Sequence, residues 1–461
     1  MYSIALIPFA ILTILFFLTN LKAGFYVTAI CIPFSINMHI TQLHITMNIP
    51  SEPLLMLLTI ILIYRFTSSS TLKTFISHPL SILIFLYCLL LLISCYFSVK
   101  PLVSLRIAAQ VLLYIVPSYF GILYISKEDP FLPLKLLLTS LFSFSVVSLI
   151  SNIKHFSYGF SRASSMGISS PFYYDHTIYA TMSAFMITLA FGLASWHLRK
   201  KHLTFYLYAL TFITCFISML SSYSRASMIS ICIAFVLYFI IRFKIRWYTI
   251  TLGIVIMGSV LLFFSDSIFM KVKRNQADSK KVKTTVEEQF KSITNVSSDL
   301  SNLERLNRWN SAIRMIKEKP LSGFGYGMYQ FEYFPYQKPN EMTFISVRNP
   351  KAKYVPGTGG SAHSEYLLTS SENGVLTGLV YIIILGTGIY LVAKNARKIT
   401  PSNYSYYALL AVGMSLTTYI VHSFFNNFLD TAKICFIFYG LLAAIVRIDI
   451  YLRNKSVFTN N

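Results

Sequence analysis

Long apolar runs, separated by short polar stretches, follow one another along most of the chain. A helix needs about 20 mostly apolar residues to cross a bilayer, and about thirteen runs reach or approach that length. We expect spans near 3–19, 23–36, 53–66, 79–98, 102–125, 131–153, 175–195, 203–222, 226–243, 247–265, 374–393, 405–425 and 430–447. The second and third runs are short, so the first 66 residues hold two or three spans. The pattern predicts an all-α polytopic membrane protein with about 12–13 transmembrane helices.

The composition agrees with this class. Hydrophobic residues make up 55% of the chain and charged residues 12%, about half the charged fraction of a soluble protein. So few charges cannot cover a soluble surface, and a disordered or collagen-like chain is excluded as well. The six cysteines lie inside apolar runs without a metal-ligand spacing. We therefore expect no disulfide, no metal site and no cofactor.

Lys and Arg exceed Asp and Glu by 22 charges. Cytoplasmic loops of membrane proteins collect basic residues, so this excess does not require nucleic acid as a partner. The basic clusters are at 197–202, 242–246, 394–398 and 447–455. Their spacing matches the predicted spans, so all four are expected on the cytoplasmic side. The segments between them, including the 154–174 loop and the Ser221–Arg225 turn, are then external.

The spans divide the chain into three regions. Residues 1–265 form an N-terminal bundle of about ten spans, 266–373 a long periplasmic loop, and 374–461 the last spans and a cytoplasmic tail. From Asp266 to Glu365 there are 16 basic and 10 acidic residues. Long loops escape the topology rule, so this excess suits an anionic ligand on the outer face. A solvated loop of mixed charge is the alternative.

Within the loop, apolar residues recur at spacings of three and four, as in an amphipathic helix. They are Leu306, Trp309, Ile313 and Ile316. We expect a helix near 302–319 whose apolar stripe packs on the membrane-embedded body. Arg305 borders this stripe and should point into a cleft beneath it, whereas Arg314 lies nearly opposite. The glycines at 323–327 lack the features of a phosphate-binding loop, so a structural turn is expected there.

Two further arginines lie where spans begin. Arg225 follows Ser224 at the start of one span, and Arg162 lies in the 154–174 loop ahead of His176 at the start of another. An arginine at the edge of the hydrocarbon is costly and indicates a functional site. Its planar fork also suits a pyrophosphate, to which it can donate paired hydrogen bonds.

His363 follows a run of small residues, 357–362, that leaves room for a substrate. A neutral imidazole near pH 7 can take a proton from a sugar hydroxyl, and an ordinary histidine pKa predicts loss of activity below about pH 6.5. Glu365 and Glu372 are competing bases. His176 and His422, the latter at the outer end of its span, are secondary candidates.

The combination resembles the O-antigen ligase / O-antigen polymerase superfamily of bacterial inner-membrane proteins. That family has a Ser/Thr-Arg pair between two spans, followed by a long periplasmic loop with three short motifs. The matching residues here are Ser224-Arg225, Arg305-Leu306 with Trp309 and Ala312, Pro320-Leu321 with Gly323 and Gly325, His363, and Glu372 with Gly374. His363-Ser364-Glu365 departs from the His-Asn of many members, and the extra leading span departs from a twelve-span plan.

The resemblance implies glycan transfer from undecaprenyl pyrophosphate to an acceptor hydroxyl on the periplasmic face, without a metal. Arg162, Arg225 and Arg305 would bind the pyrophosphate, and His363 or Glu365 would assist the hydroxyl. The acceptor would be lipid A-core for a ligase or a nascent glycan for a polymerase, and the motifs do not separate the two. Membrane lipids and a chain-length regulator protein are the other partners implied.

Two other classes stay open from the sequence. A flippase for lipid-linked sugars would also have twelve to fourteen spans and a basic cavity, although the chain shows none of the internal repeats common among transporters. A structural or assembly protein would use the long loop for docking. The arginine and histidine set favours an enzyme over both.

Overall fold

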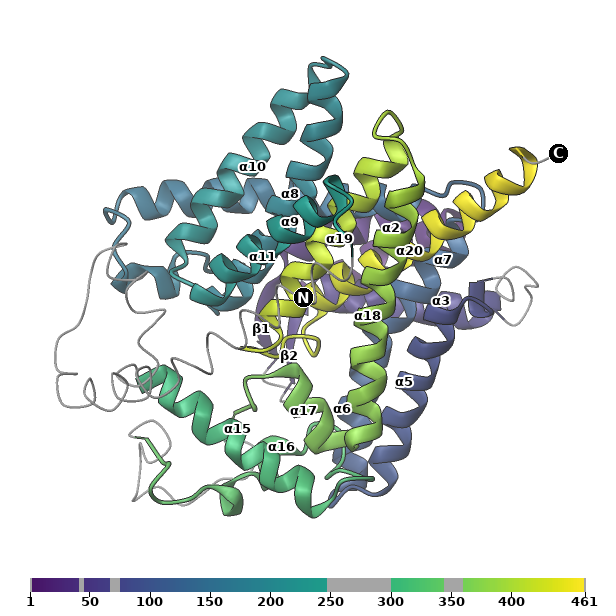
Figure 1. Cartoon of the computed structure of the whole chain (residues 1–461). Helices are drawn as coiled ribbons and strands as arrows, with labels where there is room; N and C mark the ends of the chain where they lie inside the picture. Colours follow the sequence, from purple (N-terminus) through teal and green to yellow (C-terminus); the bar gives the residue numbers. More distant parts are fainter. Residues whose placement is uncertain (1, 41–44, 67–74, 247–299, 344–359, 460–461) are drawn as a thin grey trace.

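The computed structural model describes residues 2–40, 45–66, 75–246, 300–343 and 360–459. Helices make up most of this part of the chain, arranged as a bundle with a smaller helical unit at one end (Figure 1). The bundle helices are α1 (Tyr2–Thr19), α2 (Leu21–Phe34), α3 (Ser51–Phe66), α5 (Pro79–Tyr96), α6 (Pro101–Ile115), α7 (Ile122–Ile125), α8 (Leu132–Phe156), α9 (His176–Arg199), α10 (Thr204–Ser221), α11 (Arg225–Arg242), α18 (Val375–Lys398), α19 (Tyr404–His422) and α20 (Ala432–Thr459).

Among the residues that the structure describes, eight helices are long and apolar enough to cross a membrane. One of them runs from Pro101 to Ile125, because a π-helical turn, η1 (Val116–Gly121), joins α6 to α7 without a break. The predicted class, an all-α polytopic membrane protein, is confirmed. The span expected at 247–265 lies outside the described residues.

A β-hairpin that the apolar runs did not predict follows α2. Strands β1 (Ile36–Ile40) and β2 (Ile45–Ile49) pair antiparallel, with Ile36 opposite Ile49. Alternating apolar residues in both strands are typical of a sheet with two unlike faces. The second predicted span therefore ends at Phe34, where the hairpin begins to form.

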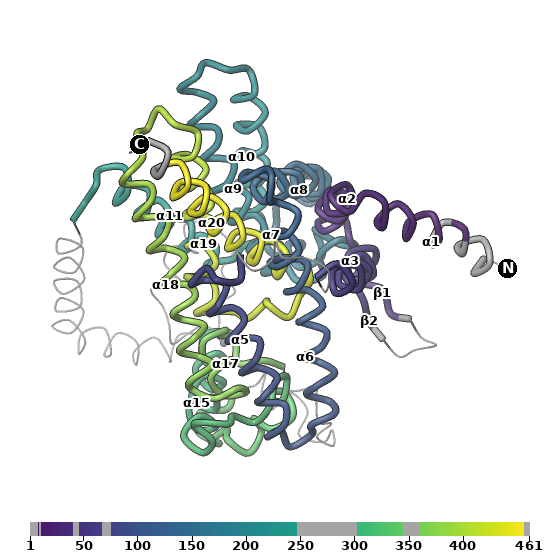
Figure 2. Tube along the Cα trace, turned by 90° about the vertical axis from the view of Figure 1, so that its right-hand side faces the viewer, coloured from purple at the N-terminus to yellow at the C-terminus, as the bar shows by residue number. Residues whose placement is uncertain are grey.

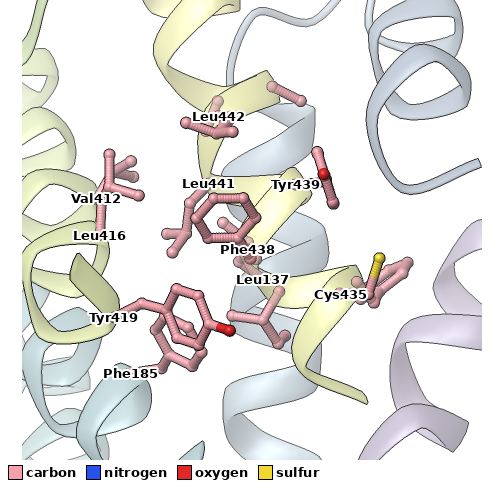
Figure 3. Packing of buried hydrophobic residues seen from close by; sticks show 14 of the residues in the cluster. Leu137, Phe185, Val412, Leu416, Tyr419, Cys435, Phe438, Tyr439, Leu441 and Leu442 are labelled. Atoms are coloured by element: carbon pink, nitrogen blue, oxygen red, sulfur yellow. The ribbon is translucent and has the colours of Figure 1, made fainter. Parts of the chain in front are cut away.

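The core of the bundle lies where α8, α9, α19 and α20 meet (Figure 3). Tyr419 stacks on Phe185 with ring centroids 5.7 Å apart and lies 5.2 Å from Phe438. At Gly192, an added Cβ would come within 2.5 Å of the Ala411 Cβ. Small residues thus let α9 and α19 approach closely, as is common between membrane helices.

The basic turns and the long loop lie at opposite ends of the bundle. In Figure 1 the α9–α10 turn and the α18–α19 turn are at the top, and the unit containing α15 is at the bottom. This arrangement agrees with the alternation inferred from the Lys and Arg clusters at 197–202 and 394–398.

The described part of the loop forms a helical unit with a small core of its own. Its elements are α15 (Leu300–Glu318), α16 (Tyr329–Glu332), the 3₁₀ turn η3 (Phe334–Tyr336) and α17 (Glu365–Asn373). Its buried residues are Ala312, Met315, Phe324, Met328, Tyr329, Tyr333 and Ala362. Figure 2 shows α5 and α6 extending alongside this unit. Ser104 donates from its Oγ to the carbonyl of Tyr326 at 2.9 Å, which ties the unit to the bundle.

The glycine-rich segment is a structural turn, as the sequence predicted. Gly323 and Gly325 have φ of +64° and +102°, which side chains rarely adopt. The Gly325 N–H donates to the carbonyl of Glu372 at 2.7 Å. The Glu372 carboxylate in turn accepts from the N–H groups of Gly327 and Tyr329, both at 2.9 Å. Two motifs of the family pattern, the glycine turn and Glu-x-Gly, therefore hold each other in place.

Helix α15 is confirmed. The prediction that its apolar stripe packs on the membrane-embedded body is wrong in part. Leu306 and Ile313 are 38% and 40% exposed. Trp309 alone in the stripe has a ring near the bundle, 6.5 Å from the Phe425 ring. The buried side is more polar and consists of Glu304, Asn307, Arg308, Ser311, Ala312 and Met315. The loop's own core takes this side, because its small residues allow close packing.

Candidate active site

A cavity of about 480 Å³ lies between the bundle and α15. Four segments that are far apart in sequence line it: 162–177, 223–229, 302–309 and 425–426. The arginines predicted for pyrophosphate all line this space, and we call it the cationic cavity. They are Arg162, Arg225 and Arg305.

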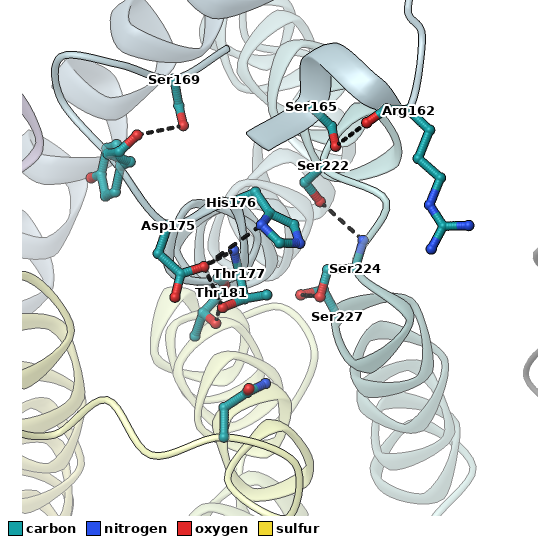
Figure 4. A network of polar contacts seen from close by, with 12 residues as sticks. Arg162, Ser165, Ser169, Asp175, His176, Thr177, Thr181, Ser222, Ser224 and Ser227 are labelled. Atoms are coloured by element: carbon teal, nitrogen blue, oxygen red, sulfur yellow. Dashed lines mark hydrogen bonds and ion pairs between the residues drawn. The ribbon is translucent and has the colours of Figure 1, made fainter. Parts of the chain in front are cut away.

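Local structure joins the turn before Arg225 to the loop that carries Arg162. Arg225 is the first residue of α11, after a tight turn in which the Ser224 N–H donates to the Ser222 Oγ at 3.4 Å. Tyr223 in that turn donates from its hydroxyl to the carbonyl of Phe160 at 2.7 Å. This bond holds the 154–174 loop, and with it Arg162, beside the turn. In the view of Figure 4, Ser222 and Ser224 lie between Arg162 and His176.

Helix N-termini add to the positive field of the cavity. α9 begins at His176 and α11 at Arg225, and residues of both first turns line the cavity. α15 contributes Asn302 and Arg305 from its first two turns. The helix dipole makes such termini favourable for anions, but at α9 the Asp175 carboxylate already accepts from the Thr177 N–H at 2.7 Å and offsets part of this field. With three arginines in its lining, the cavity suits an anionic ligand.

The cavity also has an apolar side. Met166, Ile229, Leu306 and Phe425 line it beside the arginines. The exposed stripe residue Leu306 therefore has a place in the site, which the sequence prediction did not give it. Charged groups next to apolar ones suit a ligand with an anionic head and a hydrocarbon chain.

His363 lies just outside the cavity wall. Its carbonyl accepts from the Trp309 Nε1 at 3.3 Å, and Trp309 lines the cationic cavity. Its backbone has φ +51°, a left-handed conformation that is uncommon for histidine. Burial, and then the charges of Arg308 and Arg305, lower the pKa of His363 to about 4. The ring therefore stays neutral as the pH falls well below 6.5, whereas an ordinary histidine pKa predicts that it gains a proton near pH 6.5.

Glu365 is buried beneath the turn that connects α19 and α20. Its Oε2 accepts from the N–H groups of Phe428 at 3.1 Å and Leu429 at 3.4 Å, and from the Tyr419 hydroxyl at 3.2 Å. Burial, with a contribution from Asp430, raises the pKa of Glu365 to about 8. This carboxyl holds the turn in place, and most of it is protonated at neutral pH.

Glu372 and the two secondary histidines also have structural partners. Burial raises the pKa of Glu372 to about 8, and its carboxylate holds the glycine turn described above. His422 is buried under the cationic cavity, where its Nε2 lies 2.7 Å from the Thr181 Oγ1 and 3.0 Å from the Asn426 Nδ2. His422 thereby supports Asn426, which lines the cavity, and His176 lines it directly.

Arg308 is a buried residue of the site that sequence reasoning missed. Its Nε donates to the Glu304 Oε1 at 2.8 Å, and its Nη1 donates to the carbonyl of Ser361 at 3.0 Å. The second bond fixes the small-residue segment that leads into His363. The i,i+4 spacing of Glu304 and Arg308 could have predicted the ion pair between them from the sequence.

Arg314, predicted to lie nearly opposite the apolar stripe of the helix, is bound within the loop unit. Its Nη2 lies 2.5 Å and 2.6 Å from the two carboxylate oxygens of Glu341. Its Nη1 donates to the carbonyl of Tyr336 at 2.7 Å. Arg314 therefore stabilises the loop unit on the side away from the cationic cavity.

The fold and site define a polytopic membrane protein with an arginine-lined cavity between its helix bundle and its loop unit. The family model described as O-antigen ligase matches residues 210–382. This match confirms the resemblance of the chain to the O-antigen ligase / O-antigen polymerase superfamily over that segment. A search of the curated proteins found no match. The matched segment includes Arg225, Arg305 and His363 but neither Arg162 nor His422.

Proposed function

We propose that the protein transfers a glycan from an undecaprenyl-pyrophosphate donor to a sugar hydroxyl on the periplasmic face of the bacterial inner membrane. The family match supports glycosyl transfer of the O-antigen ligase type. The observation that carries the proposal further is the convergence of Arg162, Arg225 and Arg305 on one cavity. The three arginines come from three separate parts of the sequence and meet only in the folded protein.

The cavity has suitable groups for two parts of such a donor, the pyrophosphate and the start of the lipid chain. The arginine forks can donate paired hydrogen bonds to the pyrophosphate. The apolar side, with Met166 and Ile229, can contact the first isoprene units of the lipid. A pyrophosphate leaves readily once its charge is neutralised, and fixed positive groups in a partly dry cavity provide that stabilisation most strongly as the bond breaks.

The reaction is a single displacement at the anomeric carbon. The acceptor oxygen forms a bond to this carbon, the bond to the pyrophosphate oxygen breaks, and the configuration inverts. Undecaprenyl pyrophosphate leaves with the bonding electron pair. His363, neutral in the free protein, accepts a hydrogen bond from the acceptor hydroxyl and takes its proton late in the reaction. Glu365 is the competing base.

The acceptor decides between two activities that share this chemistry. A ligase would use lipid A-core and a polymerase a nascent glycan. Deleting the gene and separating the surface polysaccharide on a gel distinguishes them. Loss of all attached glycan indicates a ligase, and a single attached repeat unit indicates a polymerase. Unchanged banding would contradict the proposal, whereas loss of lipid-linked glycan from the periplasmic leaflet would favour the flippase.

The periplasmic location gives a separate prediction. In a variant without native cysteines, Asn340→Cys should react with a membrane-impermeant maleimide added to intact spheroplasts, because residue 340 is exposed in the loop unit. Lys200→Cys, exposed at the opposite end, should react only after the membrane is opened. The reverse pattern would place the cationic cavity on the cytoplasmic side.

A further inference from the structure

A second cavity, of about 370 Å³, has two structural elements in common with the cationic cavity. At two places in the sequence, one residue lines the cationic cavity and the next residue lines the second cavity. Thr177 lines the cationic cavity and Ile178 the second one, and Asn426 lines the first and Asn427 the second. The two cavities therefore adjoin along the first turn of α9 and along the turn between α19 and α20.

His363 lies at the boundary between them. Ser361, two residues earlier, lines the second cavity. The His363 carbonyl bonds to Trp309 of the cationic cavity at 3.3 Å. The backbone around His363 therefore connects the lining of the second cavity to that of the cationic cavity.

The lining of the second cavity is chemically unlike that of the first. It carries the carboxyl groups of Asp430 and Glu372, the amides of Asn427 and Gln330, and the rings of Tyr326 and Phe428. Because burial raises the pKa of Glu372 to about 8, Asp430 supplies most of the negative charge at neutral pH. The cavity has no arginine, lysine or histidine among the described residues that line it. Carboxylates and amides bind hydroxyl pairs, and aromatic rings pack on the apolar face of a sugar ring.

Asn427 gives independent evidence that this cavity holds a ligand. It is 8% exposed, and among the described residues its Oδ1 has no hydrogen-bond partner. A buried polar atom without a partner costs free energy, so such atoms usually meet a ligand or water. The Glu372 oxygens, by contrast, already accept from two backbone N–H groups. Asn427 and Asp430 are therefore the groups available to a ligand.

The turn that carries Asn427 and Asp430 is held rigidly. Glu365 accepts from the N–H groups of Phe428 and Leu429, and the Thr431 Oγ1 donates to the carbonyl of Phe428 at 2.7 Å. A rigid turn fixes the position of a bound group before reaction.

We propose that the second cavity binds the terminal sugar of the acceptor glycan and selects an uncharged or amino sugar through Asp430 and Asn427. This inference rests on the proposed function. An acidic sugar or a phosphorylated one would be repelled by Asp430, which makes the site selective against anionic acceptors. The cationic cavity holds the donor, so opposite charges separate the two substrates.

The test is inhibition of glycan transfer by small glycosides. The purified protein in lipid nanodiscs receives lipid-linked glycan extracted from the native strain as donor and native membranes heated to inactivate enzymes as acceptor. Methyl glucoside, methyl glucosaminide and methyl glucuronide are added as competitors. Wild type should be inhibited by the first two, with the glucuronide at least about tenfold weaker, because one like-charge contact or lost hydrogen bond has that scale.

Variants of residues that line the second cavity then test whether the glycosides act there. Asp430→Asn should abolish the discrimination against the glucuronide, and Asn427→Ala should raise the KM for the acceptor about 10- to 100-fold with the KM for the donor unchanged. Glu128→Gln, an exposed carboxylate in the chain between α7 and α8, is the matched control and should behave as wild type. Normal acceptor KM and normal discrimination in both cavity variants would overturn this inference, as would wild type that no glycoside inhibits. Absence of transfer by wild type would instead overturn the proposed function.

Discussion

Arg225→Lys and Arg305→Lys are each expected to lower glycan transfer by about 10²–10³-fold, the range found when one group that stabilises a departing anion is removed. Lysine keeps the positive charge but loses the fork that donates two hydrogen bonds to a pyrophosphate. Both side chains line the cationic cavity, so the effect should appear in kcat as well as in the KM for the donor. Transfer of labelled glycan from purified lipid-linked donor is the measurement.

Arg314→Lys is a matched control on the same helix. Its fork binds Glu341 and the carbonyl of Tyr336, away from the cavity. The substitution should lower the melting temperature of the purified protein while leaving the specific activity of the folded fraction near that of wild type. Equal activity losses at all three positions would mean that α15 and α11 act only as structural supports.

His363→Ala should lower turnover by about 10²-fold, the lower end of the range for a general base, since a base of low pKa accepts a proton weakly. Donor binding should persist because the arginines are intact. His363→Gln should retain more activity than His363→Ala if the ring mainly orients the hydroxyl. If both variants work normally and Glu365→Gln is inactive, the base is Glu365.

The pH profile follows from the same histidine. Protonation removes the acceptor lone pair, so activity is present above the pKa and is lost as the pH falls through it. The pKa of His363 in the free protein is about 4, so kcat/KM should stay level from pH 8 to about 5 and fall near 4. A bound pyrophosphate offsets the charges of Arg305 and Arg308, so kcat should begin to fall at a higher pH. A fall of kcat/KM already at pH 6.5 would contradict the neutral, buried imidazole.

The sequence predicted that the three arginines lie on the same side of the membrane, and the family resemblance implied that they share one site. Apolar runs predict where spans begin and end, and Arg162 and Arg225 lie close to such ends on the same side. Arg305 follows because it borders the stripe of an amphipathic helix. These inferences use local patterns with strong physical causes, the cost of burying polar backbone in lipid above all.

Other features depend on contacts between distant segments. The apolar stripe of α15 was expected to be its buried side, and this is wrong in part. Leu306 and Trp309 line the cationic cavity, but the more polar side is the buried one, because the pattern does not reveal that the loop has a core of its own. Arg314 pairs with a glutamate 27 residues away, and no helical spacing predicts that. The β-hairpin was missed because its alternation is only five residues long in each strand. Asn427 and Asp430 lie in a turn whose backbone N–H groups bind Glu365 of α17, and a sequence pattern does not show this contact between distant segments.

The division of Asn426 and Asn427 between two cavities limits how such a protein can change during evolution. Consecutive Cα atoms are about 3.8 Å apart, and reacting atoms must come within about 3–3.5 Å of each other. In the arrangement proposed above, the peptide unit between Asn426 and Asn427 lies between the donor cavity and the acceptor cavity. Inserting or deleting a residue there would separate the substrates, whereas exchanging side chains around it would not. New sugar specificities should accordingly arise by substitution on a turn of constant length, and variation in length should be confined to segments remote from it.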